Sequence, residues 1–276
     1  MLTDPEATMP PDGQCPSDAA LTQRLEQANL NAWPSAINHW DGAWCLRIMP
    51  GSRSRRVNSV TVFDPADDAD LEARVDRMLE HFERHRVRPV FRWTPLFPES
   101  LAASLMRRGW NRISETLVMV RRPEAAPNRS NPNSMTAFAT SAVDRSSWLD
   151  GVVATGAAEA GNRKVLERTL SMIGSSFTTW LAVDANGAPV ATTLAVSDGS
   201  FVGLFLVHVA PEQRRKGLAQ TLVARACAFE RSHGAPTAWL QVEADNGPGT
   251  ALYKKAGFRT AYRYAYWVHD EGTGIS

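Results

Sequence analysis

The sequence predicts an α/β (α+β) fold made of two mixed-sheet domains in tandem. Strands and helices alternate through residues 135–276, and a similar order of elements runs through residues 17–122. A polar stretch rich in proline and asparagine, residues 123–134, separates the two and has the composition of a linker. Residues 1–16 are rich in proline, aspartate and small side chains, so we expect a tail without regular structure.

The second domain, residues 135–276, carries the clearer pattern. Ala185-Asn186-Gly187 lies between two apolar runs and is typical of a tight hairpin turn. Two helices should precede the hairpin; a long strand, a helix, a strand, a short helix and a last strand should follow it. The expected bounds are helices Ser146–Glu159 and Arg163–Ile173, then strands Thr178–Val183, Ala188–Val196, Phe201–Val209, Ala238–Val242 and Ala261–Val268.

The first domain repeats the end of this order. Strand Pro89–Trp93, a short helix and strand Ile113–Val120 match the last three elements of the second domain. In each domain a basic pair ends the short helix and a glycine then precedes an aromatic residue, as in Arg107-Arg108-Gly109-Trp110 and Lys254-Lys255-Ala256-Gly257-Phe258. Cations suit a helix C-terminus and glycine the position after it. The matching order of elements nevertheless indicates a degenerate internal duplication.

A basic loop after strand Phe201–Val209 is the most informative segment of the chain. The strand stops before Pro211, and Arg214-Arg215-Lys216-Gly217-Leu218-Ala219 then opens a helix whose first turn we expect to hold the three cations. Free backbone N–H groups and the positive end of the helix dipole attract anions, and Gly217 lets a ligand approach the backbone closely. The segment therefore predicts a site for a diphosphate.

This segment resembles the Gln/Arg-x-x-Gly-x-Gly/Ala motif with which the GCN5-related N-acetyltransferases (GNATs) hold the pyrophosphate of acetyl-CoA. The family's second signature follows at the expected distance: Asn246, then a helix with Leu252-Tyr253, then Gly257-Phe258. The resemblance implies a GNAT fold with acetyl-CoA as co-substrate, Asn246 in contact with the cofactor and Tyr253 near the thioester sulfur. The expected cofactor-binding set is Val207, His208, Val209, Arg214, Arg215, Lys216, Gly217, Leu218, Ala219, Asn246 and Tyr253.

A closer resemblance, over most of residues 24–268, is to a bacterial GNAT subgroup with the same two-domain layout. It rests on Asn31-Ala32-Trp33-Pro34, Arg56-Val57-Asn58-Ser59-Val60 and Trp239-Leu240-Gln241-Val242-Glu243-Ala244-Asp245-Asn246. Members of this subgroup have been linked to N-acetylation of amino acids, including glutamate, and of protein lysines. The resemblance implies the fold and the cofactor and leaves the acceptor open.

The first domain lacks a counterpart of the basic loop. Its hairpin of Trp44–Met49 and Arg55–Phe63, joined through Pro50-Gly51, leads into Asp64-Pro65-Ala66-Asp67-Asp68-Ala69-Asp70. Acids there should cap the next helix and suit its dipole, but they would repel a diphosphate. We therefore expect a structural copy that does not bind acetyl-CoA.

Composition argues against several other classes of protein. The chain has 276 residues, 43% of them hydrophobic, and its formal net charge of +1 gives no reason to expect nucleic acid or an acidic membrane as partner. The three cysteines, Cys15, Cys45 and Cys227, are too widely spaced to suggest disulfides or a metal site. No apolar run approaches a membrane span and the N-terminus does not resemble a signal peptide, so we expect a cytoplasmic monomer or homodimer without metal.

Acetyl transfer to an amine needs a positioned thioester, a neutral amine and a proton donor for the departing thiolate. We expect Tyr253 to be that donor; alternatively its ring packs in the core and its hydroxyl faces water. Two residues are candidate bases: His208, whose ordinary pKa suits proton removal near neutral pH, and Glu243, which could act through water. Each has a structural alternative, a hydrogen-bonded core histidine and a salt-bridged glutamate. The related subgroup often carries a carboxylate at the position of His208.

Candidates for the acceptor side come from both domains. Tyr262, Tyr264 and Tyr266 alternate along the last strand, so they share one face and could wall the acceptor pocket or pack against a neighbouring sheet. The first domain contributes Trp33, Arg47, Arg56 and Asn58, and an arginine among them could pair with an acceptor carboxylate.

Together these residues predict an N-acetyltransferase that moves the acetyl group of acetyl-CoA directly to a primary amine of a small molecule, such as an amino acid. Two alternatives stay open. One is a protein acetyltransferase acting on lysine or N-terminal amines through a groove between the domains. The other is a non-catalytic acyl-CoA-binding module, which the presence of Tyr253 argues against because a sensor needs no thiolate acid.

Overall fold

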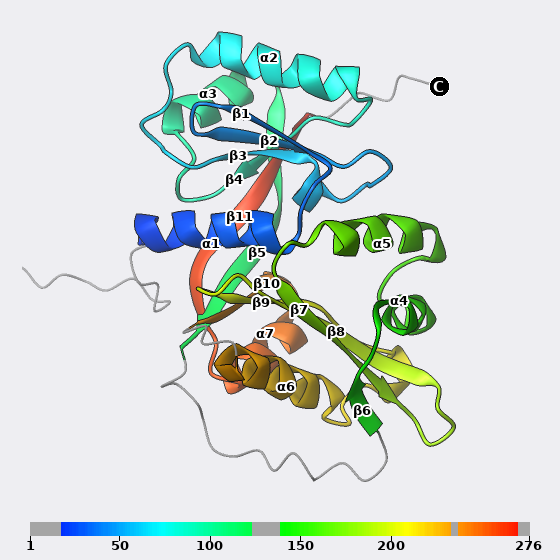
Figure 1. Ribbon diagram of the computed structural model, residues 1–276. Helices are drawn as coiled ribbons and strands as arrows, with labels where there is room; N and C mark the ends of the chain where they lie inside the picture. The colour runs from blue at the N-terminus through cyan, green and yellow to red at the C-terminus, as the bar shows by residue number, and fades with distance from the viewer. Residues whose placement is uncertain (1–17, 123–138, 233–236, 270–276) are drawn as a thin grey trace, which may run out of the picture.

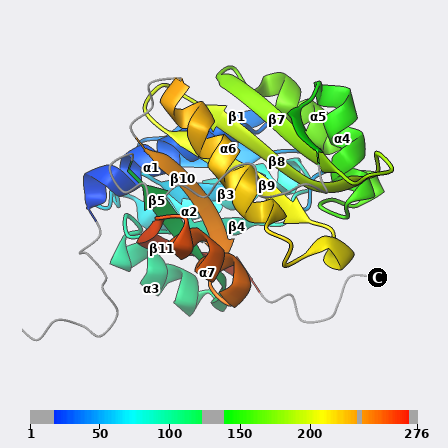
Figure 2. The same cartoon turned by 90° about the horizontal axis from the view of Figure 1, so that it is seen from below.

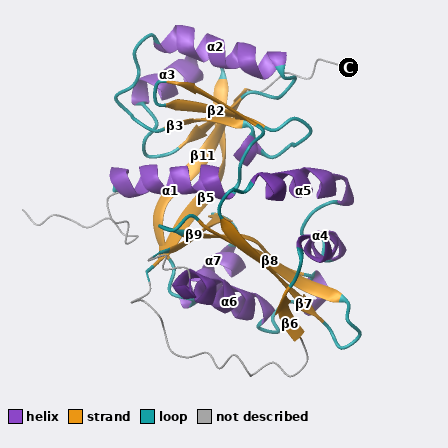
Figure 3. Cartoon of the chain, viewed as in Figure 1, coloured by secondary structure: helices purple, strands orange, loops and turns teal. Residues whose placement is uncertain are grey.

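The computed structural model describes residues 18–122, 139–232 and 237–269. These residues form one continuous eleven-stranded mixed sheet with helices packed on its faces (Figures 1 and 3). The strand order is β1-β2-β3-β4-β11-β5-β10-β9-β8-β7-β6. The predicted mixed α/β class is confirmed, whereas the expected tail at residues 1–16 and linker at residues 123–134 lie outside the described residues.

The described part of the first half contains three α-helices and five strands of this sheet. They are α1 (Ala19–Ala32), β1 (Ile37–Asp41), β2 (Trp44–Ile48), β3 (Ser59–Val62), α2 (Leu71–Arg84), β4 (Val90–Trp93), α3 (Glu99–Arg107) and β5 (Trp110–Arg121). The predicted strand Arg55–Phe63 is wrong in its first part, where Arg55–Val57 form a 3-10 turn. The side chain of Asn58 causes this: its Nδ2 donates to the carbonyl oxygens of Ser52 (2.8 Å) and Ser54 (3.3 Å) and folds the segment back on itself.

The second half contributes four helices and six strands. They are β6 (Ala139–Ala142), α4 (Arg145–Ala154), α5 (Arg163–Met172), β7 (Ser176–Val183), β8 (Pro189–Ser197), β9 (Val202–Val209), α6 (Leu218–Ser232), β10 (Ala238–Glu243), α7 (Gly247–Lys255) and β11 (Arg259–His269).

Two helix boundaries in the second half differ from the prediction. The helix expected to reach Glu159 ends at Ala154, because Gly156 has a φ of +76° that an α-helix excludes. The helix expected to begin in the basic loop begins at Leu218 instead. Arg215 and Gly217 have φ values of +61° and +80°, so the three cations lie in a loop before the helix and not in its first turn.

The last strands of the two halves are exchanged. β11 lies between β4 and β5, and β5 lies between β11 and β10, so each half completes the sheet of the other. β5 runs antiparallel to β10 from the pair Arg121 and Ala238 to the pair Thr116 and Glu243. The alternation of apolar residues predicted these strands but not their partners, because alternation along a strand does not specify its neighbour.

Helices cover opposite faces of the sheet in the second half. α1, α4 and α5 pack on one face, around a core that contains Trp148 and Phe205. α6 and α7 pack on the other face, around Leu222 and Tyr253, as the view from below shows (Figure 2). α2 and α3 close a third core in the first half with Trp44. The strands of the second half therefore lie between two separate cores, one on each face of the sheet.

Candidate active site

β9 and β10 are parallel neighbours only over their first residues. Their register runs from the pair Val202 and Ala238 to the pair Leu204 and Leu240, and within the described residues no pair joins the two strands further along. Leu206 has a φ of +48°, and the register between β8 and β9 shifts at this point, so a β-bulge bends β9. Beyond the bulge the edge of β9 therefore faces an opening and not β10.

A cavity of about 690 Å³ lies where the two strands part. Both halves of the chain line it, and so do residues from both faces of the sheet. Its described lining is Trp33, Ser52, Arg53, Ser54, Arg55, Arg56, Val57, Ser114, Thr116, Ala158, Asn162, Val165, Leu166, Thr169, Leu204, Phe205, Leu206, Val207, Gln241, Val242, Glu243, Asn246, Tyr253, Tyr264 and Tyr266. A cavity of this size suits a small ligand.

Tyr253 reaches the cavity from α7. Its side chain is buried, and its ring packs edge-on against Phe258 with the ring centroids 6.0 Å apart. Burial raises the pKa of Tyr253 to about 12, so the hydroxyl keeps its proton throughout the neutral range. Tyr253 packs its ring in the core and also lines the cavity, so a structural role and a role at the thioester are both compatible with its position.

Glu243 and Asn246 line the cavity at the end of β10. Asn246 caps α7: its Oδ1 accepts a hydrogen bond of 2.9 Å from the backbone N–H of Gly249. Glu243 is exposed, and within the described part of the chain its carboxylate forms no ion pair. Of the described residues that line the cavity, Glu243 alone carries a carboxylate.

His208 points away from this group. It lies beyond the bulge on β9, half-buried, and its Nε2 is 2.9 Å from the carbonyl oxygen of Thr155, the residue that ends α4. A carbonyl oxygen only accepts, so Nε2 carries the proton and donates. Burial lowers the pKa of His208, which keeps the ring neutral near pH 7. The cavity lining includes its neighbour Val207 but not His208.

The basic loop follows β9 and reaches the sheet face that α6 covers. Arg214, Arg215, Lys216 and Gly217 are all exposed, and Leu218 and Leu222 anchor the start of α6 in the core behind them. The loop is held by local bonds: Arg214 Nε donates to the carbonyl oxygen of Val209 (3.3 Å). The structure thus brings an exposed cationic loop, a helix N-terminus and the opening beside β9 to one end of the second half.

Comparison with known proteins decides the family. A model of the protein family described as probable histone acetyltransferase Rv0428c C-terminal matches residues 20–267. The chain belongs to this family. A curated relative, the uncharacterised N-acetyltransferase YobR of Bacillus subtilis, is 26% identical over 249 residues, which make up 89% of this chain and 98% of the relative.

Solved structures show the same fold. A GCN5-related N-acetyltransferase from Kribbella flavida superposes with a TM-score of 0.69 at 16% identity, over 94% of this chain and 98% of its own. A structure described as a tandem GNAT protein from the clavulanic acid biosynthesis pathway gives a TM-score of 0.65 at 14% identity, over 91% and 89%. The family match and the curated relative show that the protein is a GNAT acyltransferase that catalyses acetyl transfer. GNAT enzymes use acetyl-CoA as co-substrate.

The arginine segment, residues 52–57 of the first half, forms one wall of the GNAT cavity. Two of the residues predicted for the acceptor side, Trp33 and Arg56, line the cavity. The guanidinium carbon of Arg56 is 5.8 Å from the ring centroid of Trp33. The other two lie behind the wall. Arg47 is buried and donates to the carbonyl oxygens of Arg56 (2.9 Å) and Trp33, and burial lowers its pKa to about 10. Asn58 accepts from Met49 N–H (2.7 Å) while it holds the segment.

The three tyrosines of β11 share one face, as predicted, and join a buried polar network. Arg92 on β4 forms two hydrogen bonds with the carboxylate of Glu26 on α1, at 2.8 and 2.9 Å, and its guanidinium carbon lies 3.4 Å from the ring centroid of Tyr264. Tyr262 donates to the same carboxylate at 2.6 Å, and burial raises its pKa well above the ordinary value. Tyr264 and Tyr266 line the cavity; within its described lining Tyr262 is not included.

Tyr264 differs electrostatically from its two neighbours. Burial opposes its ionisation, but the charges of Arg92 and Arg56 outweigh burial and hold the pKa of Tyr264 below its ordinary value. Its hydroxyl donates to Gln241 Oε1 at 3.0 Å, which connects the last strand to β10. Burial raises the pKa of Tyr266 instead. All three tyrosines therefore pack in the core, and Tyr264 and Tyr266 also form part of the cavity wall.

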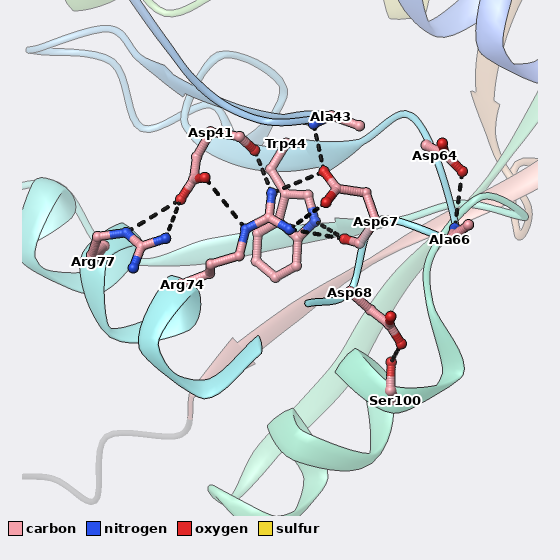
Figure 4. A network of polar contacts seen from close by, with 10 residues as sticks. All are labelled: Asp41, Ala43, Trp44, Asp64, Ala66, Asp67, Asp68, Arg74, Arg77 and Ser100. Carbon is pink, nitrogen blue, oxygen red and sulfur yellow. Dashed lines mark hydrogen bonds and ion pairs between the residues drawn. The ribbon is translucent and has the colours of Figure 1, made fainter. Parts of the chain in front are cut away.

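The acidic loop of the first half, residues 64–70, is occupied by Arg74 of α2, which pairs with the loop's own Asp67 (Figure 4). Asp67 accepts from the backbone N–H of Ala43 at 2.6 Å and from the Arg74 guanidinium at 2.8 and 3.0 Å. The hydrogen bond from Arg74 holds the pKa of Asp67 below its usual range. Arg74 also stacks on Trp44, with its guanidinium carbon 4.4 Å from the ring centroid.

The prediction that acids of this loop cap α2 is wrong for the residue at the cap. Asp70 has a φ of +52°, and its side chain makes no capping hydrogen bond. The carboxylate of Asp67 is directed instead toward Arg74, one turn inside the helix.

Several cavity residues were missed from the sequence, chiefly Arg53, Arg55, Ser114 and Gln241. The run Ser52-Arg53-Ser54-Arg55-Arg56 was a signal for the first two, since it places three cations within a short polar stretch. Ser114 and Gln241 gave no sign of a place in the cavity, because their strands, β5 and β10, become neighbours only through the strand exchange. Within residues 18–122, 139–232 and 237–269, no cluster of three or more His, Cys, Asp or Glu is placed to hold a metal. Over the same ranges no helix is long and apolar enough to cross a membrane.

Proposed function

We propose that this GNAT enzyme transfers the acetyl group of acetyl-CoA to the primary amine of a small molecule. The observation that carries the proposal is the single cavity in which the opening beside β9, Tyr253, Glu243 and the first-half wall meet. Its volume of about 690 Å³ lies in the range of small-molecule pockets, which favours a small acceptor over a folded protein surface.

The residues present fit acetyl-CoA. The exposed loop Arg214–Gly217 offers positive charge and the N-terminus of α6 to a diphosphate, with Leu218 and Ala219 starting the helix. Val207–Val209 run along the opening, where backbone groups of β9 can pair with an extended amide chain as a strand would. Asn246 reaches the same opening from the start of α7.

Two side chains are assigned to proton transfer. Tyr253, which keeps its proton at neutral pH, donates a hydrogen bond or the proton to the departing thiolate sulfur. Glu243 removes a proton from the acceptor ammonium, directly or through a water molecule, because its carboxylate faces the cavity without an ion-pair partner among the described residues. His208 is the second candidate base, and its Nε2 is engaged with Thr155.

The test is release of CoA from acetyl-CoA by the full chain with single free amines: amino acids, polyamines and a lysine peptide. Turnover with one of the small amines is the expected result. Turnover confined to the peptide would assign a protein acceptor, and tight acetyl-CoA binding without turnover on any amine would favour the non-catalytic module.

A further inference from the structure

The arginine segment gives the cavity a positive wall. Arg53, Arg55 and Arg56 all line the cavity, whereas Glu243 is the one carboxylate among its described lining residues. No ion pair joins any of the three arginines to an acid within the described residues. Arg55 Nη1 donates to the hydroxyl of Ser114 at 3.0 Å, which leaves its remaining donors available.

The wall has a defined shape, because buried groups hold its backbone from behind. Asn58 binds the carbonyl oxygens of Ser52 and Ser54, and Arg47 binds the carbonyl oxygen of Arg56. Arg56 lies over two stacked rings, with its guanidinium carbon 5.8 Å from the centroid of Trp33 and 5.6 Å from that of Phe205. Its side chain is thus placed before a ligand arrives, which lowers the entropic cost of binding.

These arginines are separate from the expected diphosphate loop. Trp33 and Phe205 belong to the core on the sheet face that α1, α4 and α5 cover, whereas Arg214–Gly217 precede α6 on the opposite face. A diphosphate held at the start of α6 therefore lies on the opposite face of the sheet from the rings under Arg56. The arginine segment therefore calls for a second anion, on the acceptor side.

We propose that Arg55 and Arg56 bind an anionic group of the acceptor, so that the preferred acceptor is an amine that carries a carboxylate or phosphate together with an apolar portion. The apolar portion packs on the rings of Trp33, Phe205 and Tyr266, and the amine is directed toward Glu243. This proposal rests on the proposed function and specifies that the acceptor carries a negative charge and an apolar portion.

The first experiment compares amines with and without an anionic group. Leucine against leucinamide, and phosphoethanolamine against ethanolamine, are tested as acceptors for CoA release by the wild type, Arg55→Gln/Arg56→Gln and the control Arg107→Gln, an exposed arginine of α3 outside the cavity. The anionic member of at least one pair should be used with a kcat/KM at least about 10-fold higher. The double variant should lose about 10- to 100-fold on that member, the range for lost charge-assisted hydrogen bonds, mainly through KM. It should lose little on the neutral member.

Equal use of the charged and neutral members, or an equal loss on both in the double variant, would overturn the proposal. The preference between carboxylate and phosphate pairs identifies the anion.

A second experiment tests binding at the anion site and does not require acetyl transfer. Saturation-transfer NMR in the presence of CoA compares N-acetylleucine with N-acetylleucinamide as probes. A stronger signal for the carboxylate that disappears in Arg55→Gln/Arg56→Gln supports the anion site even if no amine is acetylated, in which case the proposed function fails alone. If amines are acetylated but the two probes give equal signals, the proposed transferase activity is retained and the proposed anion site is rejected.

Discussion

The two halves of the chain build the same strand–loop–helix unit and use the loop in opposite ways. After β9, the loop Arg214–Gly217 is cationic and exposed, with its charges directed to solvent at the start of α6. After β3, residues 64–70 are acidic, and Arg74 from α2 occupies the inside of the loop through Asp67 and Trp44 (Figure 4). One loop is open to a ligand anion, and the other already contains an internal anion and its counter-charge.

This difference shows how two halves with a similar order of elements can differ in the loop that would hold a ligand. The donors and cations of the exposed loop Arg214–Gly217 can be hydrated when no ligand is bound. In the first half the carboxylate of Asp67 receives a backbone N–H and a guanidinium, so the loop is satisfied without a ligand. The first half then serves the active site through its arginine segment and through the strand that it exchanges.

The largest expected effect comes from Tyr253→Phe. Removal of the hydroxyl should lower kcat by about 100-fold or more, the usual contribution of a general acid, and leave the Kd for acetyl-CoA within about 2-fold. Steady-state kinetics and calorimetric titration measure the two quantities. The matched position before the basic pair of the first half is Met106, which is exposed, so Met106→Leu should leave both unchanged. Unchanged kcat in Tyr253→Phe would remove the tyrosine from the mechanism.

Glu243→Gln should lower kcat by about 100-fold at neutral pH, and the loss should become smaller as pH rises and the acceptor amine loses its proton unaided. His208→Gln is the comparison, because glutamine can keep a donor for the Thr155 carbonyl oxygen. We expect it to retain the pH–rate profile of the wild type. A profile that changes in His208→Gln but not in Glu243→Gln would assign the base to the histidine.

Arg214→Gln/Arg215→Gln should weaken acetyl-CoA binding by roughly 10- to 30-fold, because two cations leave the expected diphosphate site. The effect should shrink at high ionic strength, where charges on an exposed loop are screened. Asp64→Asn in the acidic loop is the matched control and should not change the affinity. A double variant that binds acetyl-CoA as tightly as the wild type would disconnect the loop from the cofactor.

The smallest effect, on stability alone, is expected from Asp67→Asn. It removes one of the two acidic partners of the nearly buried Arg74 and leaves Asp41 as the other, so it should lower the free energy of unfolding by about 1 kcal/mol, a value reduced for the partial exposure of Asp67. The pKa of Asp67 is depressed in the folded state, so its contribution is present above the unfolded pKa of about 4 and is lost as pH falls below it. Denaturant titrations should therefore show a shallower loss of stability below pH 4 in the variant, and an unchanged slope would contradict the role given to the pair.

The elements that could be predicted from the sequence are those with local signals. The turn at Ala185-Asn186-Gly187 was predicted because glycine permits the positive φ that Gly187 has, and α7 and β11 because capping residues and apolar alternation mark them. β1 was missed because it is a short edge strand with mostly exposed residues, which leaves little apolar alternation to detect.

Most of the site prediction came from residues that follow each other along one segment. The basic loop, Asn246 and Tyr253 follow each other along the chain, and a motif can describe them. Arg55 meets Ser114 across 59 residues of the sequence, and Arg92 meets Glu26 across 66. Such contacts depend on which strands and helices become neighbours, and no local sequence pattern around these residues indicates those neighbours.

The stoichiometry of acetyl-CoA binding tests the contrast between the halves most directly. Calorimetric titration of the full chain should give one site per chain, and Arg214→Gln/Arg215→Gln should weaken that site while Asp67→Asn leaves it unchanged. Two sites per chain, or one site that only Asp67→Asn weakens, would contradict the assignment of the open loop to the second half.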